Sequence, residues 1–117
     1  MNRRTASTSL NPLDNKTATF SFTVATVAHF FARRFEESIR WGRRTMAITS
    51  NATIPRWITA AALGHLGRIG EARVEIDELL ARHPQATLAR ARNASFRHEW
   101  MYDLYLDGLR KAGLPEN

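Results

Sequence analysis

A predicted turn between two helices, over residues 62–72, constrains the fold of this chain more than any other stretch. Its sequence is Ala-Leu-Gly-His-Leu-Gly-Arg-Ile-Gly-Glu-Ala. Gly67 can adopt the left-handed backbone conformation that ends a helix, Ile69 is expected to turn inward at the corner, and Ala72 is small where two helices must approach closely. Pro84 then prevents further helix. The stretch therefore predicts a hairpin of two packed helices.

Apolar residues at helical spacing predict further helices before and after this hairpin. The expected segments cover residues 19–32, 35–48, 54–66, 70–82 and 98–111, with a short helix or turn over 87–93. Taken alone, the alternation of Phe20, Phe22 and Val24 would also fit a strand, but an internal repeat decides in favour of a helix. Gly113 and Pro115 are expected to end the last helix.

The helices before and after residue 52 repeat at an offset of 34 residues. The matching positions are Val24 and Ile58, Ala28 and Ala62, Phe35 and Ile69, Ser38 and Ala72, Met46 and Leu80, and Ser50 and Pro84. A helix–turn–helix period of this length, with small residues where the helices cross, resembles the tetratricopeptide repeat. The copy over 53–86 follows that pattern well. The copy over 19–52 is degenerate, with Arg33 in place of the turn glycine.

The resemblance implies an all-α fold, a right-handed stack of two tetratricopeptide-like hairpins with a C-terminal capping helix. The expected domain covers residues 18–117, with repeats at about 19–52 and 53–86, a connector over 87–97 and the capping helix over 98–112. A disordered leader is expected over residues 1–17. Because a single hairpin cannot bury its apolar stripe, repeats of this kind stack. Two repeats are fewer than the usual three or so, which is typical of the tail of a longer array.

Length and composition restrict the class of protein. The 117 residues form one domain at most, and the absence of cysteine excludes disulfides, thiolate catalysis and sulfur-based zinc sites. It is also compatible with a reducing cytoplasm, which is the predicted location. No apolar run approaches the ~20 residues of a membrane span. The net charge of +6 would suit nucleic acid, anionic lipid or an acidic partner, but a solvated basic surface is the favoured interpretation.

Several segments, together spanning about residues 10–116, are similar to a narrower group of proteins. They are Leu-Asn-Pro-Leu-Asp at 10–14, Ala-His-Phe-Phe-Ala at 28–32, Ala-Ala-Leu-Gly-His-Leu-Gly at 61–67 and the stretch 88–116. They resemble the tetratricopeptide tail of bacterial multidomain proteins that carry a class III adenylate or guanylate cyclase domain or a winged-helix regulatory domain. The aspartates and the mixed sheet of that cyclase domain have no counterpart here. The resemblance therefore implies a regulatory tail without catalytic residues, although homology could attach the name of a cyclase to it.

The resemblance implies protein–protein interaction, with a partner helix or peptide docked in a concave groove. A large aromatic such as Trp57 would be a natural anchor for the partner. The candidate groove residues on the leading helices are Thr23, Thr26, Val27, Phe30, Trp57, Thr59 and Ala60. Contacts in the core or between repeats are at least as good an interpretation of the same residues. The expected partner is a protein or peptide, such as a cyclase or regulator domain.

A candidate basic patch follows the second helix and consists of Arg33, Arg40, Arg43 and Arg44. It could bind phosphate groups or an acidic peptide. Glu36 and Glu37 on the same helix can partly neutralise it, so a solvated charged face is favoured. A basic nucleic-acid-binding helical module is therefore the less favoured alternative. Self-association by end-to-end stacking of repeats is a further alternative.

No group of residues predicts catalysis, a cofactor or a metal. His98 and Glu99 begin the helix motif of zinc proteases, but Tyr102 stands where the second histidine is required. Three carboxylates on one helix face, at positions 71, 75 and 78, alternate with arginines, which indicates a solvated and ion-paired surface. The sequence therefore predicts a scaffold and not an enzyme.

Overall fold

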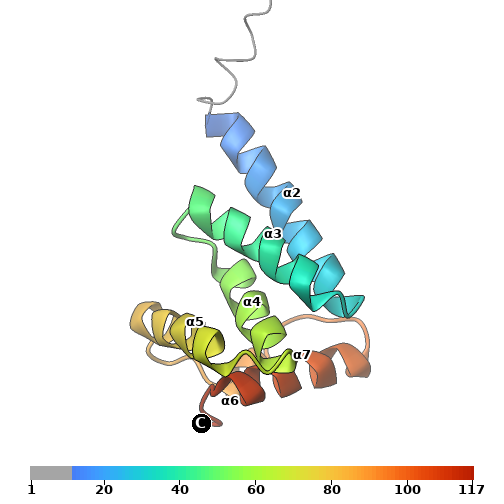
Figure 1. Ribbon diagram of the computed structural model, residues 1–117, viewed down its shortest axis with the longest axis vertical. Helices are drawn as coiled ribbons and strands as arrows, with labels where there is room; N and C mark the ends of the chain where they lie inside the picture. Colours follow the sequence, from blue (N-terminus) through green and yellow to red (C-terminus); the bar gives the residue numbers. More distant parts are fainter. Residues whose placement is uncertain (1–11) are drawn as a thin grey trace, which may run out of the picture.

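Six helices and no strand make up residues 12–117, the part of the chain that the computed structural model describes, with side chains from residue 16 onward (Figure 1). The helices are α2 (Pro12–Phe31), α3 (Phe35–Ile48), α4 (Thr53–His65), α5 (Ile69–Arg82), α6 (Leu88–Ala91) and α7 (Glu99–Ala112). The all-α class is therefore confirmed. The strand that the alternation around Phe22 would allow is not formed.

The first helix begins earlier than expected. α2 starts at Pro12 and not near residue 19. Residues 1–11 of the predicted leader lie outside the described residues, whereas residues 12–17 belong to α2 and not to a loose segment. Proline suits the first turn of a helix because the N–H that it lacks would have no partner there. α2 has 20 residues and α3 has 14, so the N-terminal turns of α2 project beyond α3 (Figure 1).

The helices pair in chain order as two hairpins, α2 with α3 and α4 with α5, and α4 lies at the centre. It packs against α2, α3, α5 and α7. α7 crosses α4 and makes only a small contact with α5 (Figure 1). The backbones of α4 and α7 come close because both carry glycine at the crossing. A Cβ atom on Gly64 would lie 2.1 Å from the carbonyl oxygen of Gly108.

The core surrounds α4 and continues into an aromatic cluster. Its largest fully buried apolar side chains are Phe30, Leu63, Ile76, Leu79 and Leu109. His65, the last residue of α4, links three elements. Its Nε2 atom lies 2.6 Å from the carbonyl oxygen of Leu104 in α7, and its ring stacks on Phe35 of α3 at 4.8 Å. The end of α4 is therefore held by both its neighbours.

The two hairpins turn with the same backbone geometry. Gly67 has a φ of +72°, as expected, and the corresponding Arg33 has a φ of +63°, which side chains disfavour. The following residues also agree, with φ and ψ of −94° and 72° at Arg34 and −85° and 69° at Arg68. In each turn two N–H groups donate to carbonyls three and five residues earlier, at 2.9–3.1 Å. The 34-residue offset of the sequence is thus kept in the backbone.

Two apolar residues of the second hairpin face solvent. Ile69, predicted to turn inward, is 48% exposed, and Val74 is 65% exposed. Val74 lies on the face of α5 opposite the buried Ala72. In the first hairpin, Phe35 stands in the position of Ile69 and is covered by the ring of His65. α7 crosses α4 instead of continuing the stack on α5, so Ile69 lacks such a cover.

Candidate functional site

Two adjoining hollows flank Trp57, one of about 490 Å³ and one of about 520 Å³. Both are lined by Thr53 and Trp57 from α4, and by Arg90 and Asn93 from α6 and the turn after it. Because the two hollows share these four residues, we describe them together as one site. We call it the Trp57 trough.

One half of the Trp57 trough is apolar. Besides Trp57 it is lined by Val27 of α2, Ile54 and Ile58 of α4, Ala94 and Phe96 of the connector, and Tyr105 of α7. Ile54 is 57% exposed, so part of this apolar surface faces solvent. Burial raises the pKa of Tyr105 above its ordinary value, so the phenol stays neutral. Apart from Arg90, which lines both hollows, this half offers an uncharged surface, to which helices from both hairpins contribute.

The other half of the Trp57 trough is polar and basic. Its charged or titratable side chains are Arg82, His83 and Arg90, and no carboxylate lines either hollow among the described residues. Arg82 is already engaged, because its Nε donates to Glu78 at 2.9 Å and its Nη1 to the carbonyl of Ser50 at 2.9 Å. Arg90 has no carboxylate partner within the part of the chain that the structure describes.

Tyr102 fixes the connector that forms one wall of the trough. Its hydroxyl donates to the carbonyl of Ala94 at 2.7 Å and accepts from the N–H of Phe96 at 3.0 Å. The ring of Phe96 then packs against Phe31, Tyr102 and Tyr105 with centroids 5.0–5.2 Å apart. Tyr102, which stands where a zinc protease would have its second histidine, therefore anchors the wall of the trough.

The structure separates the predicted groove residues into three groups. The side chains of Thr26, Phe30, Thr59 and Ala60 are fully buried and cannot touch a partner, so their assignment to a groove is corrected to core. Thr26 faces inward because its hydroxyl donates to the carbonyl of Phe22, and Thr59 lies under Gly42 of α3. Val27 and Trp57 do line the trough. Thr23 is half-buried on α2 and lines neither hollow.

Several trough residues were missed by reasoning from the sequence. They are Ile54, Arg90, Asn93, Phe96 and Tyr105. One signal could have found the wall, because Phe96 is a lone aromatic in an otherwise polar stretch between two predicted helices. Such a residue needs an apolar surface to pack on, and the groove was the nearest one available.

The predicted basic patch does not form one surface. It consists of Arg33, Arg40, Arg43 and Arg44. The last three line one shallow depression on α3, whereas Arg33 lines a different hollow together with residues of α7. Arg40 pairs with Glu37, and the guanidinium of Arg44 lies 5.1 Å from the ring of Trp41. The charge is therefore spread over separate local contacts.

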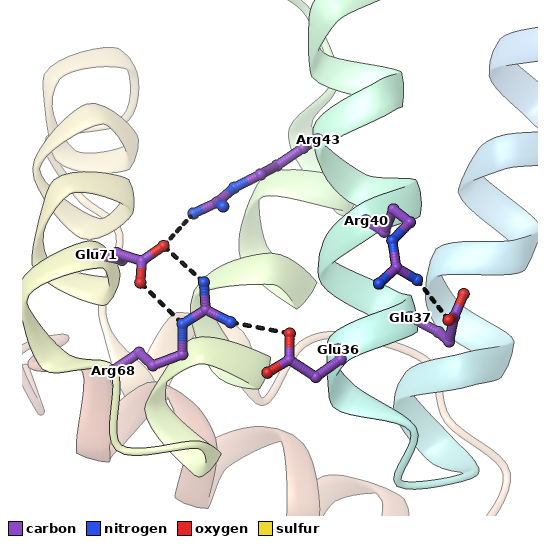
Figure 2. A network of polar contacts seen from close by, with 6 residues as sticks. All are labelled: Glu36, Glu37, Arg40, Arg43, Arg68 and Glu71. Atoms are coloured by element: carbon purple, nitrogen blue, oxygen red, sulfur yellow. Dashed lines mark hydrogen bonds and ion pairs between the residues drawn. The ribbon is translucent and has the colours of Figure 1, made fainter.

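Carboxylates neutralise much of this arginine surface (Figure 2). Arg68, in the turn of the second hairpin, donates to Glu71 at 2.8 Å and to Glu36 of α3 at 2.9 Å. Arg43 of α3 donates to the same Glu71 at 3.0 Å. The hydrogen bonds from Arg68 and then from Arg43 lower the pKa of Glu71 from 4.5 to about 2. The network joins the two hairpins. Glu71 and Glu78 are ion-paired at the surface as expected, whereas Glu75 pairs with Arg56 at 3.3 Å and its side chain is only 14% exposed.

The described residues form neither a metal site nor a membrane-spanning helix. Their His, Asp and Glu side chains form no group of three that could hold a metal ion. None of the helices α2–α7 is both long enough and apolar enough to cross a membrane.

The chain was compared with models of protein families, with curated proteins and with solved structures, and it matches none of them.

Proposed function

We propose that this chain is a non-catalytic scaffold of the tetratricopeptide type that binds a helix or peptide of a partner protein. The Trp57 trough carries the proposal. It brings an aromatic side chain of α4 together with Val27 of α2, Tyr105 of α7 and the connector in a depression open to solvent. Aromatic residues in such depressions often anchor protein interfaces.

The tetratricopeptide-type arrangement is supported by the two turns. They repeat the same hydrogen bonds at the 34-residue offset, even though one has Arg33 where the other has Gly67. We propose a right-handed stack of the two hairpins with α7 as a cap on α4. The close approach of Gly64 and Gly108 supports this capping, because it buries the face of α4 that would otherwise be open.

We further propose a role as the regulatory tail of a bacterial cyclase-type or transcriptional-regulator protein in the cytoplasm. This rests on the resemblance of the segments named above, above all residues 88–116. That stretch behaves as one docked unit, since the N–H groups of Leu88 and Ala89 donate to the carbonyls of Pro115 and Glu116 at 2.8 and 3.1 Å. A partner domain that docks on residues 88–116 would also contact the adjacent Trp57 trough.

Nucleic-acid binding receives less support. Two of the α3 arginines that would contact phosphates, Arg40 and Arg43, are already paired with Glu37 and Glu71. Neutralising phosphates would require breaking these pairs, which lowers the gain in free energy from counterion release.

A peptide selection tests the proposal. A library of random peptides would be selected on the immobilised chain, on Trp57→Ala and on Trp100→Ala. Trp100 is 48% exposed but lines neither hollow, so it is a matched aromatic control. We expect peptides that bind the chain and the Trp100→Ala variant but bind Trp57→Ala at least about tenfold more weakly. Peptides that bind all three proteins equally would refute the trough as the binding site.

A further inference from the structure

The charge of the Trp57 trough restricts what it can bind. Among the residues that the structure describes, its lining contains Arg82, His83 and Arg90 and no carboxylate. Arg82 is already paired with Glu78, whereas Arg90 donates to the neutral Gln85. On the surface of α3, by contrast, Arg40 and Arg43 each have a glutamate partner. The guanidinium of Arg90 therefore favours a partner with negative charge.

Arg90 is the group that would contact this charge. It lines both hollows and lies next to Trp57 and Asn93. Its Nη2 donates to the side-chain oxygen of Gln85 at 2.9 Å, a neutral acceptor that orients the guanidinium without cancelling its charge. The backbone is set independently, because the N–H of Arg90 donates to the Thr87 hydroxyl at 3.1 Å. The guanidinium keeps free donors for a carboxylate.

An apolar track leads away from the trough along α2. Phe20, Val24 and Val27 lie at spacings of four and three residues, which places them on one face of the helix. Phe20 is 71% exposed, Val24 is 50% exposed, and Val27 lines the trough together with the exposed Ile54. A partner that covers this surface must bring several apolar side chains.

We infer that the Trp57 trough binds an acidic, amphipathic segment of another protein. Its aliphatic or aromatic side chains would cover Trp57, Val27 and the α2 track, and an Asp or Glu would pair with Arg90. This inference rests on the proposed function and adds the chemistry of the partner. The N-terminal residues 1–11 of this chain are a poor occupant, because they contain two arginines and no acidic residue.

The composition of the selected peptides tests the inference separately from the proposed function. We expect peptides selected on the chain to be rich in Asp and Glu near Leu, Ile, Phe or Trp. Synthetic peptides from this pool should bind at least about tenfold more weakly when their acidic residues are changed to Asn or Gln, in line with a charge-assisted hydrogen bond. The binding should weaken with added salt.

Two variants of Arg90 locate the effect. Arg90→Gln should remove the preference for acidic peptides, and Arg90→Glu should select peptides with Lys or Arg instead. Arg97→Glu makes the same charge change at an exposed position of the connector that lines neither hollow, and it should keep the preference. Thermal unfolding followed by circular dichroism checks that each variant remains folded.

The other outcomes separate the two ideas. Peptides that depend on Trp57 but carry no excess of acidic residues would overturn this inference and leave the proposed function intact. A preference for acidic peptides that survives in Arg90→Glu would also overturn it. If no peptide depends on Trp57, the proposed function fails and the inference fails with it. Displacement of acidic peptides by a single-stranded oligonucleotide would point to nucleic acid as the occupant and overturn both.

Discussion

The two hairpins share one backbone geometry but reach it with different residues. The first hairpin uses Arg33 in the left-handed position where the second uses Gly67. Where α2 meets α3, the buried Ser38 hydroxyl donates to a carbonyl of α2 at 2.8 Å, and the second hairpin has the buried Ala72 in the same register position. The backbone of such a turn therefore tolerates changes in the side chains around it.

The largest difference lies further along the second helix of each hairpin. Gly42 of α3 and Ile76 of α5 occupy the same register position, and both are buried. α4 crosses directly over Gly42, where an added Cβ would lie 2.0 Å from the Thr59 hydroxyl oxygen. α7 touches α5 only at its margin, so Ile76 fills the wider space there. What packs on a hairpin, and not the hairpin itself, decides the size of the residue at this position.

Ile76→Ala should give the largest effect on stability. Ile76 is 1% exposed, so its loss leaves a cavity, and we expect the free energy of unfolding to fall by about 2–5 kcal/mol. Urea denaturation would measure it. Val74→Ala is the control on the same helix, since Val74 faces solvent and should change stability by less than about 0.5 kcal/mol. Equal losses in the two variants would contradict the assignment of α5's inner face.

Gly42→Ala should also lower the free energy of unfolding, but by overpacking the contact between α3 and α4 and not by leaving a cavity. We expect a loss of about 1–3 kcal/mol, although alanine is the better helix former. Gly70→Ala, in a helical position with open space around it, should be neutral or stabilising. A double-mutant cycle with Thr59→Ala should recover much of the loss, because the colliding hydroxyl is gone. Additive effects of the two substitutions would disprove the collision.

Opposite substitutions at the left-handed position of the two turns should change stability in opposite directions. Gly67→Ala should lower the free energy of unfolding by about 1–2 kcal/mol through its positive φ alone, since nothing lies near the added Cβ. Arg33→Gly should instead raise it, by at most about 1 kcal/mol, because glycine relieves the same strain but gains freedom in the unfolded chain. Thermal denaturation would measure both. A loss of stability in Arg33→Gly would mean that the Arg33 side chain stabilises the first turn.

The smallest of these effects on stability should come from acid, which weakens the ion network between the hairpins. The pKa of Glu71 is lowered to about 2 in the folded chain, from 4.5. Its contribution to stability is therefore complete above pH 4.5 and is lost as the pH falls toward 2. The difference in stability between the chain and Glu71→Gln should shrink across this range and should be smaller throughout in high salt. A difference that does not change with pH would rule out the network as its source.

The sequence predicted the hairpins well because their signals are local. The left-handed conformation at Gly67 follows from one residue type, and the period of 34 residues located the matching turn at Arg33 in spite of the missing glycine. It could not predict how α7 would pack. That depends on the contact between Gly64 and Gly108, two residues far apart in the chain with no pattern that links them.

The candidate site was predicted only in part for the same reason. Trp57 and Val27 were found because large apolar residues on leading helices are natural groove residues. Thr59 and Ala60 were assigned to the same groove, yet they face α3 and the core, since α4 is covered on nearly every side. The wall with Arg90 and Phe96 comes from a connector whose path depends on the hydrogen bonds of Tyr102, which no spacing rule anticipates.

The central position of α4 has a consequence for how the chain opens. Nine of its 13 residues are buried, and it contacts both helices of the first hairpin as well as α5 and α7. If α4 unwound, α5 and α7 would lose their main neighbour, and the first hairpin would lose a large packing surface. We therefore expect amide protons in α4 to exchange with deuterium most slowly, at the rate set by global unfolding. The N-terminal turns of α2, which project past α3, should exchange first.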